Sequence, residues 1–250
     1  MNQHTKKALL LFLTIIAVSG VFFLHPIRQS LAYHDFADKR TFFNIRNFFN
    51  VVSNLPFLFV GTVGLLAIGR CSLATQELHI YFALYLGVFL TGLGSAYYHW
   101  LPNNNTLVWD RIPMTLVFMS LLSATVAAFI NRHLGIIVFW PTMVLGIASV
   151  LWWHYGDLRG HGDLRLYGFV QFYPAVFIPL IVFLFQDRSR IATFRLLLWA
   201  IAWYAIAKLC EYADSTIYRL LGISGHTLKH VAAAISTWFL VKMFGERHST

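Results

Sequence analysis

Long apolar segments follow one another along the chain, and short breaks that carry polar and turn residues separate them. Eight such segments cover 8–24, 50–69, 78–100, 113–131, 134–153, 166–185, 194–212 and 226–244. Each is close to the roughly 20 apolar residues that an α-helix needs to cross the hydrocarbon core of a bilayer. The pattern therefore predicts an all-α polytopic membrane protein, a seven-transmembrane helix bundle with an extra N-terminal span.

The first segment, 8–24, follows Lys6 and Lys7 and is short enough to resemble a secretory signal. No small-residue cleavage pattern follows Leu24, so we expect a retained span. The predicted organisation is an N-terminal span with a polar segment over 1–49, the seven-helix bundle over 50–244, and a C-terminal tail over 245–250.

Composition excludes most other classes of protein. The chain is 58% hydrophobic and only 12% charged, about half the roughly 25% charge of soluble domains. Its net charge of +9 is scattered singly between apolar runs, which does not resemble a nucleic-acid-binding surface. We expect a multi-pass integral membrane protein whose cations meet lipid headgroups and which has no nucleic-acid partner.

Alternation of the spans assigns each connection to one end of the bundle. The end called face A receives 25–49, 99–112, 154–165 and 211–226, and face B receives the remaining connections and both termini. Lys and Arg are divided equally between the two faces, so the positive-inside rule separates them little. Lys6 and Lys7 beside the first span favour a cytoplasmic face B.

Five polar side chains gather at face A, although ionisable groups within a membrane cost several kcal/mol unless they are partnered. Ser95 and His99 are four residues apart at the end of one span, and His226 and His230 are four apart at the entry to another. Such pairs lie on one helical face. Asp110 is expected at the entry to the span 113–131. Alternation therefore places all five residues at one membrane depth.

Three imidazoles and a carboxylate suit Zn²⁺, because catalytic zinc sites have three protein ligands and one open position. Asp110 would transfer a proton, and Ser95 would donate a hydrogen bond to a developing oxyanion. Each residue also has a structural alternative: a serine bonded to its own helix, a packed histidine, or an aspartate that caps a helix. The coincidence of all five favours a functional site.

The spacing of Ser95, His99, Asp110, His226 and His230 resembles that of the alkaline ceramidase family. That family belongs to a group of seven-helix membrane hydrolases that also includes the progestin and adipoQ receptors. Supporting stretches are NVVSNL over 50–55, GDLR over 156–159, VQF over 170–172 and SGHTLKH over 224–230. The resemblance extends over about residues 35 to 244.

The resemblance implies an intramembrane zinc amidase that cleaves the N-acyl bond of ceramide to a sphingoid base and a fatty acid. The family's zinc ligands correspond to His99, His226 and His230, its catalytic aspartate to Asp110 and its serine to Ser95. The implied partner is a membrane lipid substrate, and no obligatory protein partner is evident.

Eukaryotic members of the family also bind Ca²⁺ in the acidic segment before the first core helix. The matching candidates here are Asp35, Asp38 and Asn47, with Lys39 and Arg40 beside them. Calcium takes six to eight oxygen ligands, so this set predicts a poor calcium site.

Two other functions share some of these features. A seven-helix receptor of the progestin and adipoQ type, with secondary hydrolase activity, would have the same five residues, although 50–55 and 156–159 favour the ceramidase side. A haem protein would need axial ligands from opposite sides of the macrocycle, whereas His226 and His230 point the same way from one helix.

Overall fold

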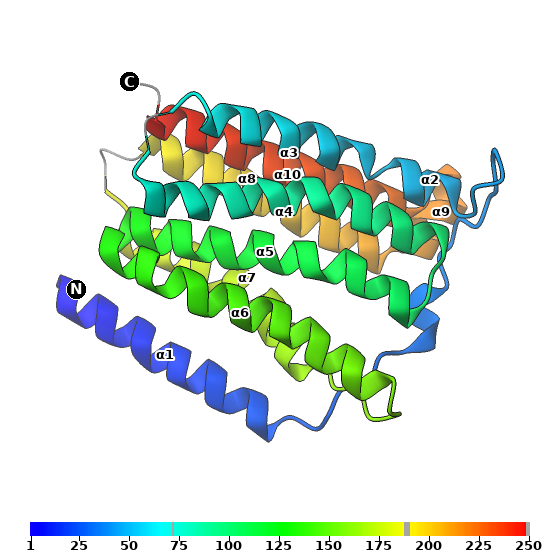
Figure 1. Ribbon diagram of the computed structural model, residues 1–250, viewed down its shortest axis with the longest axis horizontal. Helices are drawn as coiled ribbons and strands as arrows, with labels where there is room; N and C mark the ends of the chain where they lie inside the picture. Colours follow the sequence, from blue (N-terminus) through cyan, green and yellow to red (C-terminus); the bar gives the residue numbers. More distant parts are fainter. Residues whose placement is uncertain (72, 188–190, 249–250) are drawn as a thin grey trace.

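The computed structural model describes residues 1–71, 73–187 and 191–248, and within these ranges it is an all-α bundle with no β-strand (Figure 1). Its elements, in chain order, are α1 (Gln3–Phe23), a 3₁₀ turn η1 (Leu31–His34), α2 (Phe48–Val52), α3 (Leu55–Ile68), α4 (Thr75–Trp100), α5 (Asn104–Phe129), α6 (Arg132–Asp157), α7 (Arg165–Phe185), α8 (Ile191–Tyr212), α9 (Asp214–Leu221) and α10 (Gly225–His248). The predicted fold class is confirmed.

Among the described residues, seven helical segments are long and apolar enough to cross a membrane: α1, α2 and α3 taken together, and α4 to α8. This finding supports a multi-pass membrane protein. The eighth expected span corresponds to α10, which carries Lys229, His230 and Lys242 among its apolar residues. It packs along α8 and α3, with His230 buried, Lys229 half-buried and Lys242 exposed.

The helices run along one common direction, with α3, α4, α5 and α6 side by side and α10 next to α3 and α8 (Figure 1). Helix α1 lies at the edge of the bundle and packs on α7, where the Thr14 and Tyr173 hydroxyls are 2.8 Å apart. The start of α1 and the end of α10 lie at the same end of the bundle, and α2 and α9 lie at the other (Figure 1). This second end is face A.

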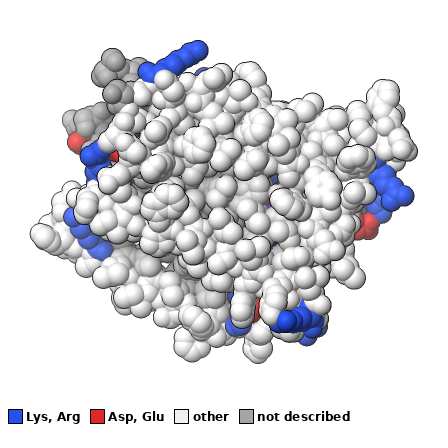
Figure 2. Space-filling model, viewed as in Figure 1, with Lys and Arg blue, Asp and Glu red and all other residues white. Residues whose placement is uncertain are grey.

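The outer surface of the bundle is apolar. Large hydrophobic side chains such as Phe59, Trp140 and Phe183 are exposed on the long helices. Figure 2 shows that charged side chains lie toward the margins of the molecule, while the central part of this face carries almost none. An apolar belt between charged ends is the arrangement that a bilayer requires.

Helix α5 begins earlier than the apolar pattern predicts. It starts at Asn104 rather than near residue 113, and Pro113 lies inside it. The Asn103 side chain caps the helix by accepting hydrogen bonds from the Asn105 and Thr106 backbone amides. The expectation that Asp110 stands at the helix entry is therefore wrong, because Asn103 starts the helix and Asp110 follows within it.

Candidate metal centre

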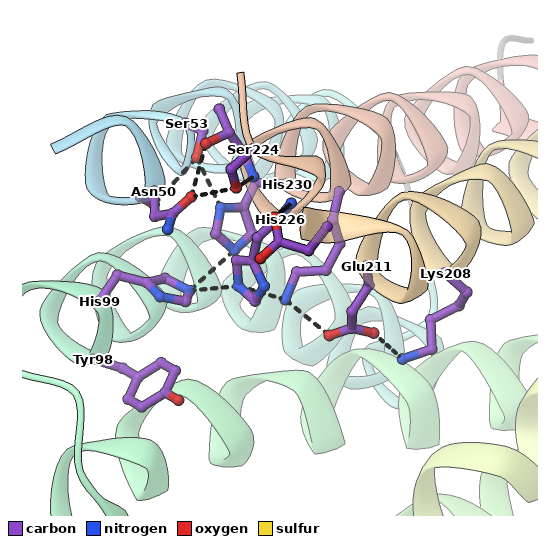
Figure 3. A network of polar contacts seen from close by, with 12 residues as sticks. Asn50, Ser53, Tyr98, His99, Lys208, Glu211, Ser224, His226 and His230 are labelled. Carbon is purple, nitrogen blue, oxygen red and sulfur yellow. Dashed lines mark hydrogen bonds and ion pairs between the residues drawn. The ribbon is translucent and has the colours of Figure 1, made fainter. Parts of the chain in front are cut away.

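Three histidines converge at face A, from the last turn of α4 and the first turns of α10 (Figure 3). All three side chains are buried. The Nε2 atom of His99 lies 3.1 Å from that of His230 and 3.3 Å from that of His226. Within the described ranges, this is the one group of three or more His, Cys, Asp and Glu side chains close enough to hold a metal ion.

The spacing of the nitrogens suits a tetrahedral metal. With metal–nitrogen distances of about 2.0–2.1 Å, adjacent ligands of a tetrahedral site lie roughly 3.3–3.4 Å apart. The two Nε2–Nε2 distances of 3.1 and 3.3 Å are close to this ligand-to-ligand distance. His99, His226 and His230 therefore form a buried cluster that could hold a metal ion.

Ser53, which lies between α2 and α3, contacts His230 and orients its ring. The Ser53 hydroxyl donates to the Asn50 carbonyl and lies 2.8 Å from His230 Nδ1. A hydroxyl that donates its single proton to the Asn50 carbonyl accepts from Nδ1–H of His230. That tautomer leaves a lone pair on Nε2, the atom that points into the cluster, as metal ligation requires.

Asp214, the first residue of α9, fixes the start of α10. One of its carboxylate oxygens accepts a 2.9 Å hydrogen bond from the His226 backbone amide, and the other accepts one of 3.1 Å from Ala37. Gly225 permits this close approach, because a Cβ there would overlap the Cys210 carbonyl oxygen. The Asp214 carboxylate therefore links the start of α10 to the segment that precedes α2.

The segment before α2 covers the cluster from the outside. The Phe36 ring lies 4.7 Å from the rings of both His99 and His226, measured between centroids, and is 3% exposed. Asn47 donates a 2.8 Å hydrogen bond to the His99 carbonyl. This cover separates the histidines from the aqueous phase at face A.

Lys229 brings a cation to the edge of the cluster. Its ammonium lies 2.9 Å from His226 Nε2 and 3.1 Å from a Glu211 oxygen, and Glu211 also pairs with Lys208 at 2.5 Å (Figure 3). The lone pair on His226 Nε2 cannot be shared between Lys229 and a metal. Metal binding would therefore leave Lys229 paired with Glu211 alone.

Ser95 and Asp110 meet where α4 and α5 cross. A Cβ at Gly94 would overlap the Trp109 carbonyl oxygen, so glycine is required for this contact. That carbonyl has no intrahelical partner at position 113, because Pro113 lacks an N–H. The close crossing lets the Asp110 carboxylate interact with the Ser95 hydroxyl.

A cavity of about 430 Å³ opens beside the cluster. Ser95, Asp110 and His230 line it together, and most of its remaining wall is apolar and comes from α4, α5, α7, α8 and α10. Pockets for small molecules have volumes of about 300–1,000 Å³. The cavity can therefore hold an elongated apolar ligand with one end beside His230 and Asp110.

The candidate calcium residues do not converge. Asp38 is 1% exposed, and its two oxygens accept hydrogen bonds of 2.9 and 2.6 Å from the Arg40 guanidinium. This bond to Asp38 raises the pKa of Arg40 above its ordinary value. Asp35 pairs with Lys39 at the surface, and Asn47 points to His99. These residues do not fit a calcium ion.

Several residues of the site were missed by the sequence patterns. Ser53 and Asp214 support the histidines, Lys229 and Arg111 bring cations to the cavity, and Phe36 covers the cluster. One signal was available for Lys229 and Arg111, since each is a charged residue next to a predicted site residue.

Comparisons of the chain with family models, with curated proteins and with solved structures find no match.

Proposed function

We propose that the protein is a zinc-dependent intramembrane amidase that hydrolyses the N-acyl bond of ceramide-type lipids. The observation that carries this proposal is the convergence of three buried Nε2 atoms beside a cavity that Asp110 and Ser95 also line. A metal site, a carboxylate and a hydroxyl at one end of an apolar cavity are the groups that amide hydrolysis needs.

Zinc is the metal that this donor set suits best. Three neutral imidazoles, no thiolate and a near-tetrahedral spacing are typical of catalytic zinc. Haem fits poorly, because the three Nε2 atoms converge on one point rather than facing each other across a macrocycle. When bound, Zn²⁺ supplies Lewis acidity, which polarises an amide carbonyl and makes a water molecule more acidic.

The chain's own residues supply the proton transfers. Asp110 accepts the proton of the attacking water and returns it to the leaving amine, so the products are a carboxylic acid and a free amine. Ser95 donates a hydrogen bond to the oxygen of the former carbonyl as negative charge develops there. Phe36 keeps bulk water away from the histidines.

The shape of the cavity supports a lipid substrate. Phe57, Val88 and Leu240 are among its apolar lining residues, and Leu240 lies near the face B end of α10. An acyl chain can extend along this wall while its carbonyl remains beside Asp110.

A hydrolysis assay on the purified protein in nanodiscs tests the proposal. Ceramide, phytoceramide and other N-acyl lipids are supplied, and released fatty acid is measured before and after chelation. We expect hydrolysis that chelation abolishes and Zn²⁺ restores. A protein that holds zinc at the three histidines but releases no fatty acid from any N-acyl lipid would exclude an amidase.

A further inference from the structure

Arg111 is a buried cation that the proposed chemistry does not use. It follows Asp110 in α5, is 5% exposed and lines the same cavity. Its guanidinium carbon lies 4.2 Å from the ring centre of Trp153 and 4.6 Å from that of Tyr167. These rings hold the guanidinium by cation–π contacts and restrict its orientation.

The hydrogen-bonding capacity of this guanidinium is only partly used. Nη2 donates a 2.6 Å bond to the Gln29 side-chain oxygen, whereas the buried Nη1 has no hydrogen-bond partner. None of the ion pairs among the described residues involves Arg111. A buried charged donor without a hydrogen-bond partner is costly, so this arrangement is typical of a group that receives its partner from a ligand.

The charge of the cavity wall favours an anion. Its charged lining residues are the cations Arg111, Lys208 and Lys229 and the carboxylates Asp110 and Glu211, so three positive charges meet two negative ones and leave an excess of +1. Lys208 and Lys229 both pair with Glu211. The wall as a whole therefore favours an anionic ligand over a cationic one.

The position of Arg111 also limits where the anion can lie on a substrate. Consecutive Cα atoms are about 3.8 Å apart, and Asp110 and Arg111 both line the cavity. Because neighbouring residues of a helix point in different directions, a ligand whose amide lies beside Asp110 would meet Arg111 with its headgroup rather than with the amide itself. Its acyl chain would occupy the apolar part of the wall.

We propose that the substrate bears an anionic oxygen group, a carboxylate or a phosphate, in its headgroup, and that Arg111 binds this group. The proposal rests on the proposed function and narrows its substrate class to N-acyl lipids with an acidic headgroup. Arg111 can donate from Nη1 to one anionic oxygen, a charge-assisted bond.

Equilibrium binding to the purified protein in nanodiscs tests this without requiring turnover. The probes are N-palmitoylglycine and its uncharged methyl ester, N-palmitoyl-ethanolamine phosphate and the uncharged N-palmitoylethanolamine, and palmitic acid and hexadecanol. We expect the wild-type protein to bind the first two acids about 10- to 100-fold more tightly than their neutral partners, the range for a hydrogen bond to a charged group. Equal affinity within both of these pairs would overturn the proposal.

Variants assign the preference to Arg111 rather than to a bound metal. Arg111→Gln should reduce the acid-to-neutral ratio to near one, with bound metal unchanged. Arg28→Gln is the matched control, because Arg28 is exposed, adjoins Gln29 and does not line the cavity; its ratio should equal that of the wild type. An unchanged ratio in folded Arg111→Gln would contradict the assignment. If that variant does not fold, the wild-type ratios still decide whether an acidic headgroup is preferred.

Palmitic acid separates the substrate from the product. An Arg111-dependent preference for palmitic acid over hexadecanol, without one for the acidic amides, would assign Arg111 to the released fatty acid and overturn the proposal. If the protein prefers the acidic amides but hydrolyses neither of them, the assignment of Arg111 is supported and the amidase is rejected. If it hydrolyses neutral ceramide and shows no preference for acidic amides, the amidase is supported and the assignment of Arg111 is rejected.

Discussion

The histidine cluster and the acidic segment before the bundle both offered ligands for a metal, and the structure arranges them in opposite ways. At the cluster, three imidazoles converge, and the Ser53 hydroxyl lies 2.8 Å from His230 Nδ1. In the acidic segment, both oxygens of Asp38 already accept hydrogen bonds from Arg40. The histidine cluster could hold a metal ion, whereas the carboxylate of Asp38 is already paired with a cation of the chain, Arg40.

The comparison shows that residue type alone does not identify a metal site. A carboxylate that a side chain of the protein already neutralises is a poor ligand, and a histidine is oriented for ligation when its other nitrogen has a partner, as His230 has in Ser53. The four predictions below test this difference between the two regions, beginning with the largest expected effect.

Replacing His230 by alanine should abolish hydrolysis of N-acyl lipids, because two imidazoles cannot retain a catalytic metal with an open position. We expect His99→Ala and His226→Ala to behave alike. Fatty-acid release per mole of protein is the measurement. His161→Ala, which removes an exposed histidine from the loop before α7, is the control and should keep full activity. Equal activities of His230→Ala and His161→Ala would contradict the account.

Replacing Asp110 by asparagine should lower turnover by roughly 10²–10⁴, the usual range for a general base, since an amide cannot accept the water's proton. The bound metal should remain. Asn103→Ala is the matched control: it removes the cap of the same helix and should cost about 1 kcal/mol of stability without a comparable loss of turnover. Turnover of Asp110→Asn within a few-fold of wild type would remove Asp110 from the mechanism.

Ser53→Ala should weaken metal binding by about 10- to 100-fold, the usual effect of losing a hydrogen-bond partner of a ligating histidine. Metal affinity can be measured by competition with a chelator of known affinity. Thr125→Val removes a buried hydroxyl from α5 that bonds the Leu121 carbonyl, and it should leave the metal affinity unchanged. An unaltered affinity in Ser53→Ala would show that His230 is oriented by other contacts.

The smallest effects are expected in the acidic segment. A calcium-selective chelator should change neither activity nor melting temperature, because the Asp38 oxygens are occupied by Arg40. Arg40→Gln should lower the melting temperature, since it leaves the buried Asp38 carboxylate without its partner. Lys39→Gln should lower it less, because the ion pair between Lys39 and Asp35 is exposed. Loss of activity on calcium removal would show that the segment binds the ion.

Apolar segments located the long helices, but they did not give the helix ends. Hydropathy reports contact with lipid, whereas a helix continues through polar turns that pack inside the bundle. Helix α5 therefore starts at Asn104, within a stretch that has the composition of a loop, and α10 continues to His248 into the predicted tail over 245–250. Residues 249–250 lie outside the described part of the chain.

The spacing of the site residues predicted the histidine cluster, but it did not predict the residues that support the histidines. An interval of four residues fixes the relative positions of His226 and His230 within one helix. The contact between Ser53 and His230 depends on the break between α2 and α3, and that of Asp214 depends on α9. Neither element is long enough to give a clear pattern in the sequence.

The account depends most on the claim that His99, His226 and His230 bind one metal ion. X-ray absorption at the zinc edge of the purified protein tests this claim directly. We predict a spectrum with imidazole scattering from three nitrogens at about 2.0–2.1 Å and one further light ligand. Protein without zinc, or zinc whose spectrum lacks three imidazole ligands, would contradict it.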